Sequence, residues 1–301
     1  MLRLHYSALS DVGRVRKDNQ DSGYAGPWLL AVCDGVGGAA RGDIASATAI
    51  SQLRRLDTPA PLPAQQGSAP AADTAPPEDA DTVVESTDEH DPAEEALLGE
   101  VSGALHRAQD RIGELVDDDP TLMGTSTCAT LVRFDGARVA VGHVGDSRAY
   151  LLREGRLRQL TRDHTFVQSL IDEGRITEAE ARVHPHRNVI LRALDGTTDI
   201  EPDLFVVPLQ AGDRLFLCSD GACGVLDDDR LAELLADGTP DFAAVELVSA
   251  SLEAGSTDNV TCLVADVIDD AEAEARADEL AELQPLLVGS AAELDRKSTR
   301  L

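Results

Sequence analysis

Short apolar runs separated by turn residues give the chain the pattern of a mixed helix and strand protein. Residues 2–9 alternate roughly between apolar and polar positions, and residues 28–33 form a continuous apolar run, so both predict strands. Residues 44–56 and 93–116 carry apolar residues at helical spacing instead. The candidate core positions of the second helix are Ala96, Leu97, Leu105, Ile112 and Leu115.

The middle of the chain predicts β-hairpins. Asp135-Gly136 lies between the apolar runs 125–134 and 137–144, and residues 147–160 predict a second hairpin that turns at Glu154-Gly155. Because hairpins make antiparallel sheets, the pattern disfavours a doubly wound parallel fold. The remaining predicted elements are helices at 166–176 and 178–183, strands at 203–209 and 214–219, helices at 230–238 and 242–255, and a closing strand at 259–267.

Residues 57–92 interrupt this pattern with a composition rich in Pro, Ala and acids. No Lys or Arg occurs between Arg55 and Arg107. Such a segment buries too little apolar surface to offset its ordering entropy. The sequence therefore predicts a disordered acidic insertion inside one folded domain, residues 1–268, with a docking or phosphorylated segment as the alternative.

An acidic, Ala-rich tail follows at residues 269–301. Leu280, Leu283 and Leu287 recur at a spacing that suggests an amphipathic helix. Such a helix would either dock on the domain or bind a partner, and the sequence leaves both open.

Charge and composition narrow the choice of partner and compartment. The formal net charge is −29, which argues against nucleic acid, because phosphate backbones need basic patches. No apolar run reaches the roughly 18–20 residues of a membrane span, and no signal pattern begins the chain, so a cytoplasmic protein without a membrane anchor is expected. Four of the five cysteines lie in apolar, strand-like runs and none forms a CxxC pair, which predicts reduced core thiols.

Several aspartates stand where predicted strands begin or end. Asp34, Asp146 and Asp220 each end an apolar run, Asp258 precedes the closing strand, and Asp21 lies between the first two strands. Strand ends meet at the rim of a sheet, where gathered carboxylates repel one another unless a cation neutralises them. Mg²⁺ and Mn²⁺ prefer such oxygen ligands. Any one Asp-Gly pair alone is more typical of a turn, so the prediction of a metal site depends on the acids together.

The residues around these acids resemble the motifs of one enzyme family. The stretches are VRKDNQDSGY (15–24), CDGVGGAARGDIAS (33–46), MGTSTCATL (123–131), VGHVGDSRAYLLREG (141–155), LCSDG (217–221) and GSTDNVT (255–261). In this order they resemble the metal-dependent protein serine/threonine phosphatases of the PP2C type (the PPM family), and the bacterial subgroup above all. The resemblance implies an α+β fold, a four-layer α/β/β/α sandwich of two antiparallel sheets flanked by helix pairs. It also implies a flap over residues 160–196.

The resemblance implies a site with two core Mn²⁺ or Mg²⁺ ions. Asp34 would bridge both ions, Asp220 and Asp258 would complete the first site, and the Gly35 carbonyl would serve the second. Asp21 would hold metal-bound waters in an outer shell. A water between the ions would then attack phosphorus directly, without a cysteine or serine nucleophile.

Further roles follow from the same resemblance. Asp146 would bind a third, weaker ion, and Arg16 would hold the substrate phosphate through its planar fork. Val36 stands where some relatives carry a histidine, so a metal-bound water is expected as the general acid rather than His143, His164 or His186.

The implied function is hydrolysis of phosphoserine and phosphothreonine in proteins, opposing bacterial Ser/Thr kinases, by a monomer. The alternative from another class is a non-catalytic module of the same fold that binds phosphoproteins. A third reading keeps the hydrolysis but changes the substrate to an anti-sigma-factor antagonist or a small phosphate ester.

Overall fold

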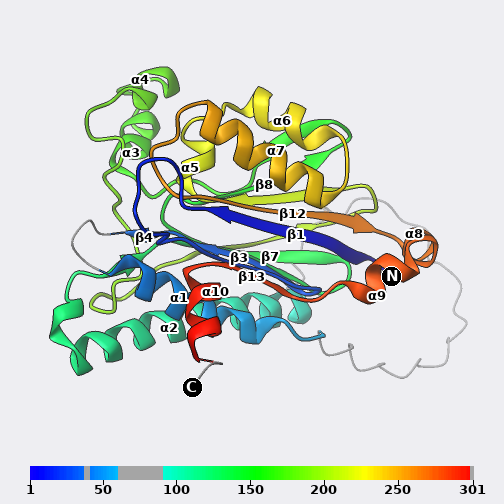
Figure 1. Ribbon diagram of the computed structural model, residues 1–301, viewed down its shortest axis with the longest axis horizontal. Helices are drawn as coiled ribbons and strands as arrows, with labels where there is room; N and C mark the ends of the chain where they lie inside the picture. Colours follow the sequence, from blue (N-terminus) through cyan, green and yellow to red (C-terminus); the bar gives the residue numbers. More distant parts are fainter. Residues whose placement is uncertain (37–40, 60–90, 299–301) are drawn as a thin grey trace, which may run out of the picture.

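Two antiparallel sheets, packed face to face, form the centre of the protein (Figure 1). The computed structural model describes residues 1–36, 41–59 and 91–298. Within these residues, one sheet has the strand order β1 (Arg3–Asp11), β12 (Val260–Ile268), β11 (Arg214–Cys218), β8 (Arg148–Arg153) and β9 (Arg156–Gln159). The other has the order β10 (Asp203–Pro208), β7 (Arg138–Val144), β6 (Ala129–Phe134), β3 (Leu29–Cys33), β2 (Ser22–Ala25) and β13 (Leu286–Gly289).

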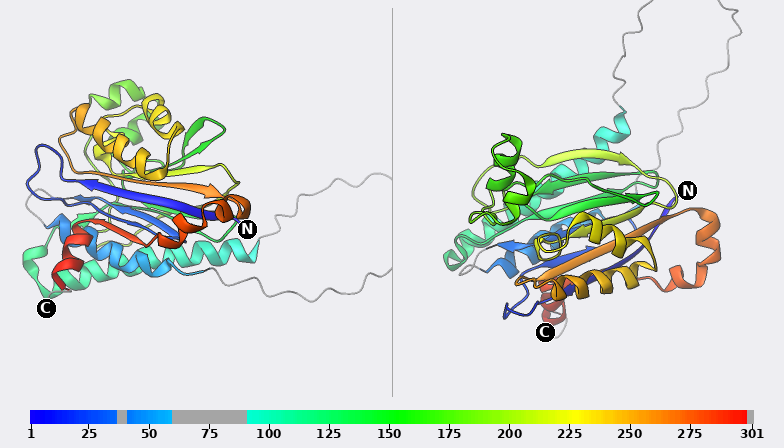
Figure 2. Two further views of the ribbon diagram at one scale, coloured as in Figure 1. Left: turned by 45° about the vertical axis from the view of Figure 1, so that its right-hand side comes forward. Right: turned by 90° about the horizontal axis from the view of Figure 1, so that it is seen from above.

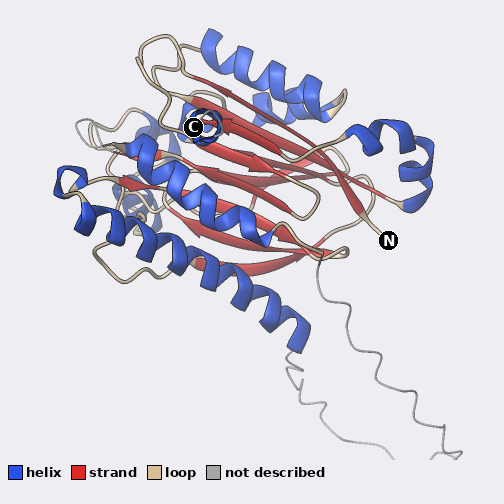
Figure 3. Ribbon diagram, turned by 60° about the horizontal axis from the view of Figure 1, so that its bottom comes forward, coloured by secondary structure: helices blue, strands red, loops and turns tan. Residues whose placement is uncertain are grey.

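Helices cover the outer face of each sheet. Helices α1 (Gly42–Leu53), α2 (Pro92–Asp118) and α10 (Ser290–Ser298) lie on the side of the sheet that holds β3, and α5 (Asp220–Cys223), α6 (Asp228–Ala236) and α7 (Pro240–Glu253) lie on the side that holds β12 (Figures 1 and 2). Figure 3, seen from below Figure 1, shows long helices that cover the sheet and run in roughly the same direction as its strands. The predicted α/β/β/α sandwich is confirmed.

Strand β3 explains why residues 28–33 read as a continuous apolar run. Leu29, Ala31 and Cys33 face the helices, whereas Leu30 and Val32 face the second sheet, and all five side chains are fully buried. A strand between two apolar layers has no polar face. Burial of each such aliphatic side chain contributes roughly 1.5–3 kcal/mol, which suits a chain with only 3% aromatic residues.

All five cysteines are free and buried, as the sequence predicted. Cys218 and Cys262 lie opposite each other on β11 and β12, and Cys33 ends β3. Burial raises the pKa of the Cys262 thiol, which keeps it in its unreactive protonated form.

The expected helices differ from the structure mainly at their ends. Helix α2 starts at Pro92, with the Asp91 side chain accepting a hydrogen bond from the Ala93 N–H. Helix α3 (Phe166–Asp172) stops earlier than the predicted residue 176 because Gly174 adopts a left-handed φ of 66°. Helix α4 (Glu178–Arg182) begins with a capping box at Thr177.

The predicted insertion lies largely outside the described residues, which omit 60–90. Its two ends are well anchored. The Asp57 carboxylate accepts hydrogen bonds from the Tyr24 hydroxyl (2.7 Å) and the Trp28 N–H (2.8 Å). At the other end, Arg138 donates to the Asp91 carboxylate at 2.6 Å.

The predicted single helix of the tail is wrong. Two short helices, α8 (Asp270–Ala275) and α9 (Ala277–Glu282), precede Pro285, and β13 follows. Strand β13 pairs antiparallel with β2, with Leu287 opposite Tyr24. A proline cannot continue a helix, and β2 offers a free strand edge, so pairing replaces the last helical turn. Residues beyond the sequence-based boundary at 268 thus complete the sheet.

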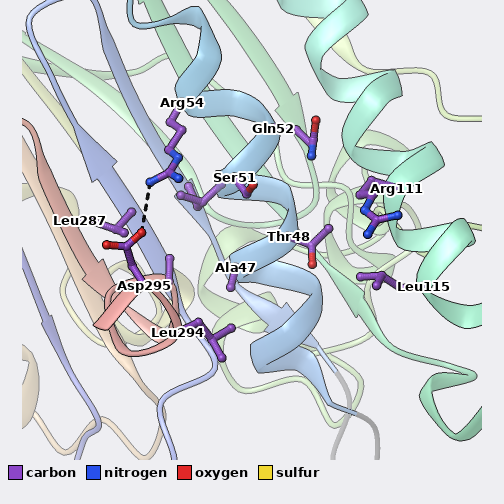
Figure 4. A pocket seen from close by; sticks show the side chains of 12 residues that line it. Ala47, Thr48, Ser51, Gln52, Arg54, Arg111, Leu115, Leu287, Leu294 and Asp295 are labelled. Carbon is purple, nitrogen blue, oxygen red and sulfur yellow. Dashed lines mark ion pairs between the residues drawn. The ribbon is translucent and has the colours of Figure 1, made fainter. Parts of the chain in front are cut away.

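Helix α10 packs beside α1 and closes a hollow of about 340 Å³ against α2 (Figure 4). Arg54 on the 3-10 turn η1 (Arg54–Leu56) faces Asp295 of α10 across it, with 3.7 Å between nitrogen and oxygen. No helix in the described ranges is both long enough and apolar enough to pass through a lipid bilayer.

Candidate active site

The five predicted aspartates gather at one end of the sandwich, where β4 (Gly35–Val36), α3 and α5 lie in Figure 1. Each one stands just before or just after a central strand, and neighbouring antiparallel strands bring these positions together. Their mutual repulsion is visible in the pKa of Asp34, which burial raises well above its usual range and which nearby carboxylates raise further. The carboxylates that do so are Asp21, Asp220, Asp146 and Asp258.

The main-chain carbonyl of Asp34 is held by two hydrogen bonds. Its carbonyl accepts hydrogen bonds from the Cys128 N–H and the Thr127 hydroxyl, both at 2.8 Å. The next residues form β4 (Gly35–Val36), which pairs with β5 (Ser126–Thr127) and not with β3. The Asp34-Gly35 pair therefore leads into a small third sheet and does not form a hairpin.

Gly35 is required by close backbone packing. A Cβ at this position would lie 2.4 Å from the Gly42 carbonyl oxygen and 2.6 Å from that of Gln20, far inside normal contact. The absence of a side chain lets the start of α1 and the loop before β2 close around the residue that follows Asp34.

Asp21 is a buried carboxylate, with 1% of the residue exposed. The hydroxyls of Ser219 and Thr261 both donate to its Oδ2 atom at 2.7 Å. Burial raises the pKa of Asp21 to about 7, the two hydrogen bonds lower it in part, and the charges of Asp220 and Asp258 raise it again.

Asp146 and Asp220 both line the hollow beside the site. Burial and then the charge of Asp220 raise the pKa of Asp146 to about 7. Burial and then the charge of Asp258 raise the pKa of Asp220 to about 6, and a hydrogen bond with Asp34 opposes this rise. The Asp220 Oδ1 atom is buried and has no hydrogen-bond partner. A buried carboxylate oxygen without a donor is suited to a cation.

Arg16 and Asp258, predicted to hold phosphate and metal respectively, contact each other. Arg16 donates to Asp258 Oδ2 at 2.6 Å, and its side chain is 47% exposed. This hydrogen bond is the largest cause of the raised pKa of Arg16. The loop that carries Arg16 is fastened by Asn259, which donates to the Val12 carbonyl at 2.8 Å and accepts from the Gln20 N–H at 2.8 Å.

The sequence reasoning missed the residues that hold these acids in place. Ser219 and Thr261 hold Asp21, Asn259 fastens the loop of Arg16, and the Cys128 thiol donates to Asp146 Oδ1 at 3.2 Å. Their positions beside Asp220, Asp258 and the strand ends were visible in the sequence. Their partners were not, because each contact joins segments far apart in the chain.

The acids fit hydrated divalent ions better than a dry cage of carboxylates. Among the described residues, no three Asp, Glu, His or Cys side chains are close enough to enclose an ion by themselves. Mg²⁺ usually keeps several waters and takes one or two carboxylates directly. The unpaired Asp220 oxygen and the raised pKa of Asp34 together mark a place where a cation would relieve both burial and repulsion.

A hollow of about 200 Å³ joins these acids to the flap. Asp146 and Asp220 line it from the sandwich, and Arg182 and Arg187 line it from the flap. Two other flap cations are occupied, since Arg162 pairs with Asp172 and Arg175 pairs with Glu173.

The histidines near the site are structural in their contacts. His143 lies inside β7, fully buried between the Thr130 hydroxyl and the Arg162 carbonyl, and burial lowers its pKa to about 4. It is a strand residue, as predicted. His186 lies on the outer part of the flap, where its ring packs against Phe166.

Comparison with known proteins identifies the family. The chain matches the protein phosphatase 2C family over residues 10–255. It is 39% identical over 289 residues to the serine/threonine protein phosphatase PstP of Mycobacterium tuberculosis, covering 96% of this chain and 48% of that protein. It is 32% identical over 269 residues to the serine/threonine phosphatase stp of Listeria monocytogenes, covering 87% of this chain and 95% of that protein. The chain spans about half the length of the mycobacterial relative.

Solved structures agree with the sequence comparison. A crystal structure of the M. tuberculosis phosphatase PstP/Ppp superposes with a TM-score of 0.75 at 39% identity, covering 89% of this chain and all of that one. A structure of the PstP catalytic domain in complex with two manganese ions gives a TM-score of 0.73 over 89% of this chain and all of that one, also at 39% identity. The chain belongs to the protein phosphatase 2C family.

Proposed function

We propose that this protein is a metal-dependent phosphatase that hydrolyses phosphoserine and phosphothreonine in proteins. The single observation that carries the proposal is the group of five mutually repelling aspartates at the strand ends, in a chain of the protein phosphatase 2C family. Relatives named serine/threonine phosphatases support the choice of substrate. A non-catalytic module would have no need to keep buried, repelling carboxylates.

The metal site would use Asp34, Asp220 and Asp258 around the first ion and Asp34 with the Gly35 carbonyl around the second. Asp146 would hold a third ion with lower affinity. Asp21 would orient the waters bound to the ions without contacting an ion directly. The PstP catalytic domain, at 39% identity, was solved in complex with two manganese ions, which supports a site for two divalent ions here, Mn²⁺ or Mg²⁺. When bound, the ions would neutralise phosphate charge and supply an activated water.

Arg16 would hold the substrate phosphate. Its guanidinium is half-exposed and donates to Asp258, so it already has an anionic partner at the right place. A phosphate monoester offers the same fork-shaped match with more charge. Substrate binding would therefore exchange one anion for another, while Asn259 keeps the loop in place.

The first experiment compares turnover of p-nitrophenyl phosphate and of a phosphothreonine peptide, with Mn²⁺, with Mg²⁺ and with EDTA. We expect turnover only with a divalent ion, and a higher kcat/KM for the peptide. Turnover of small esters alone would favour the small-molecule substrate. Absence of both turnover and calorimetric metal binding would leave the phosphoprotein-binding module as the explanation.

The Asp34→Asn variant tests the placement of the site. Loss of the bridging charge should remove turnover and leave the circular dichroism spectrum unchanged. The matched control is Asp117→Asn, which makes the same change on the exposed side of α2. Near-normal turnover of Asp34→Asn would show that the reaction occurs elsewhere.

Partners and compartment follow from the same proposal. Phosphorylated proteins, including bacterial Ser/Thr kinases, would be the substrates, and the enzyme would act as a monomer. Five free, buried thiols suit a reducing compartment, so we infer the cytoplasm. Phosphoproteomics of a strain without the gene would identify the substrates, and light scattering would give the oligomeric state.

A further inference from the structure

Near the start of the flap, His164 is hydrogen-bonded to the turn that carries Asp146. The ring nitrogen Nδ1 of His164 accepts a hydrogen bond from the Gly145 N–H at 3.1 Å. The His164 N–H also donates to the Gly145 carbonyl at 2.7 Å. Further along the flap, the Leu191 N–H donates to the His164 carbonyl at 2.7 Å. His164 therefore joins the two segments at the base of the flap, around residues 164 and 191, to Gly145, the residue before Asp146.

The Gly145 turn has little room to move. Gly145 has a φ of 115°, and a Cβ there would lie 2.3 Å from the Cys128 sulfur. The same Cys128 thiol donates to Asp146 Oδ1. A shift of the turn would break this contact, so the position of the Asp146 carboxylate depends on what holds the Gly145 peptide.

The ring of His164 is itself held in one orientation. Its side chain is 9% exposed, and it packs on the ring of His143 with 4.8 Å between centroids. Its Nε2 atom lies 3.2 Å from Asp203 Oδ2 at the start of β10, although off the line of a well-aligned hydrogen bond. A proton on Nε2 faces the carboxylate, which leaves Nδ1 as the acceptor that the Gly145 N–H requires.

Unpaired polar atoms concentrate around the same turn. In the parts of the chain that the structure describes, four buried side-chain nitrogen or oxygen atoms lack a hydrogen-bond partner. Three of them belong to Ser147, His164 and Asp220, which border Asp146 in sequence or in space. Buried polar atoms without partners are rare, and those of Ser147 and Asp220 lie on either side of Asp146, which supports a functional role for this position.

We propose that His164 is a positioning residue for Asp146, with Asp203 fixing its tautomer. The imidazole connects the base of the flap to the Gly145-Asp146 turn. The position of the flap therefore determines the position of the Asp146 carboxylate, which would bind the weakest ion. The inference deepens the proposed function, because it rests on the proposed role of Asp146 toward a third ion. His164 contacts no reacting atom in this scheme and acts only through the Gly145 peptide.

Three substitutions separate the two ring nitrogens. Asparagine places an acceptor oxygen near the position of Nδ1, glutamine places its amide near the position of Nε2, and alanine removes both. His164→Asn should keep the Gly145 hydrogen bond, whereas His164→Gln and His164→Ala should lose it. Asp203→Ala should give an intermediate loss by freeing the tautomer. Glu201→Ala, an exposed acid two residues away, is the matched control.

The main measurement is Mn²⁺ binding by calorimetry, which separates the strong ions from the weak one. We expect His164→Ala and His164→Gln to weaken the last ion about 10- to 100-fold, as loss of an orienting hydrogen bond does at other metal sites. The strong ions should bind as in the wild type, and His164→Asn should restore most of the affinity. Amide hydrogen exchange of Gly145, measured without metal, should quicken in the Ala and Gln variants alone.

The possible failures are distinguishable. Absence of any Mn²⁺ binding by the wild type would overturn the proposed function. Binding of two ions only, or a weak ion unaffected by Asp146→Asn, would remove the role of Asp146 and this inference with it. If all three His164 variants bound the weak ion as tightly as the wild type, with unchanged hydrogen exchange at Gly145, this inference would be refuted and the proposed function would stand. A loss in His164→Asn as large as in His164→Ala would assign the effect to packing on His143.

Discussion

Removing the negative charge of Asp21 should stabilise the metal-free protein near neutral pH. Asp21 is buried beside Asp220 and Asp258, and its pKa rises from an ordinary value of 3.8 to about 7. Burial is the largest cause. A folded-state pKa above the unfolded value means that the folded protein holds a proton which the unfolded chain has already lost.

The sign of the effect follows directly. Below about pH 4 the carboxyl is protonated in both states and carries no penalty. As pH rises from about 4 through 7, the unfolded chain ionises first, and stability is lost progressively. A difference of about three pH units corresponds to roughly 4 kcal/mol once pH exceeds 7. Because Asp21 is coupled to the other acids, this figure is an upper bound for one residue and is not summed with theirs.

The Asp21→Asn variant removes the charge and keeps the contacts. Ser219 and Thr261 both donate to one oxygen of Asp21, and the amide oxygen of asparagine can accept both. Urea unfolding in EDTA at pH 4.5, 6.0 and 7.5 should show similar stability of the two proteins at the lowest pH. The variant should be more stable by up to about 4 kcal/mol at the highest.

Comparison with the wild type at each pH is essential, because surface carboxylates in ion pairs change stability in the opposite direction. Asp117→Asn on α2 makes the same change of side chain at an exposed position and provides the surface control. Saturating Mn²⁺ should reverse the order, stabilising the wild type more than Asp21→Asn. A wild-type advantage at pH 7.5 in EDTA would refute the reasoning that Asp21 is a desolvated, repelled carboxylate.

Three further changes test other parts of the structure. Gly35→Ala should cost about 1–3 kcal/mol in urea unfolding, because its Cβ would meet two backbone carbonyls; a neutral effect would mean that α1 moves freely there. Arg214→Met should lower the melting temperature by an amount corresponding to about 1.5–3 kcal/mol, since it leaves the partly buried Asp266 without its bidentate partner; a negligible change would show that water replaces the guanidinium. Arg16→Ala should raise KM for a phosphopeptide far more than it lowers kcat for the same peptide. An effect on kcat alone would exclude a role of Arg16 in ground-state binding of the phosphate.

The sandwich itself was predictable because its signals are local. Continuous apolar runs such as 28–33 and the Asp135-Gly136 hairpin each specify an element from neighbouring residues. The ends of strands then placed Asp34, Asp146 and Asp220 at a common rim. Strand termini and turn residues thus carry enough information to locate the acids, although not their individual environments.

The contacts that orient those acids were not predictable, since they join distant segments. Thr261 reaches Asp21 across 240 positions of sequence, and Asn259 reaches Asp18 across 241. The tail failed for a related reason. Leu287 has a spacing that fits a helix, but the free edge of β2 competes for the same residues and lies more than 260 positions away. The spacing of apolar residues within one segment carries no information about a pairing strand so far away in the sequence.

The pairing of β13 with β2 makes the first acid depend on elements that are synthesised much later than β2. The Ser290 N–H donates to the Asp21 carbonyl at 2.8 Å, and the Ser290 hydroxyl bonds to the Asn19 carbonyl. In a nascent chain, which grows from its N-terminus, the Asp21 and Asn19 carbonyls therefore lack these hydrogen bonds until residue 290 has emerged from the ribosome. A shortened version that stops at the family match, residue 255, would lose β12 as well and carry this gap permanently. The hydrogen bonds that Ser290 makes beside Asp21 thus form only after β13 and the start of α10 have been synthesised.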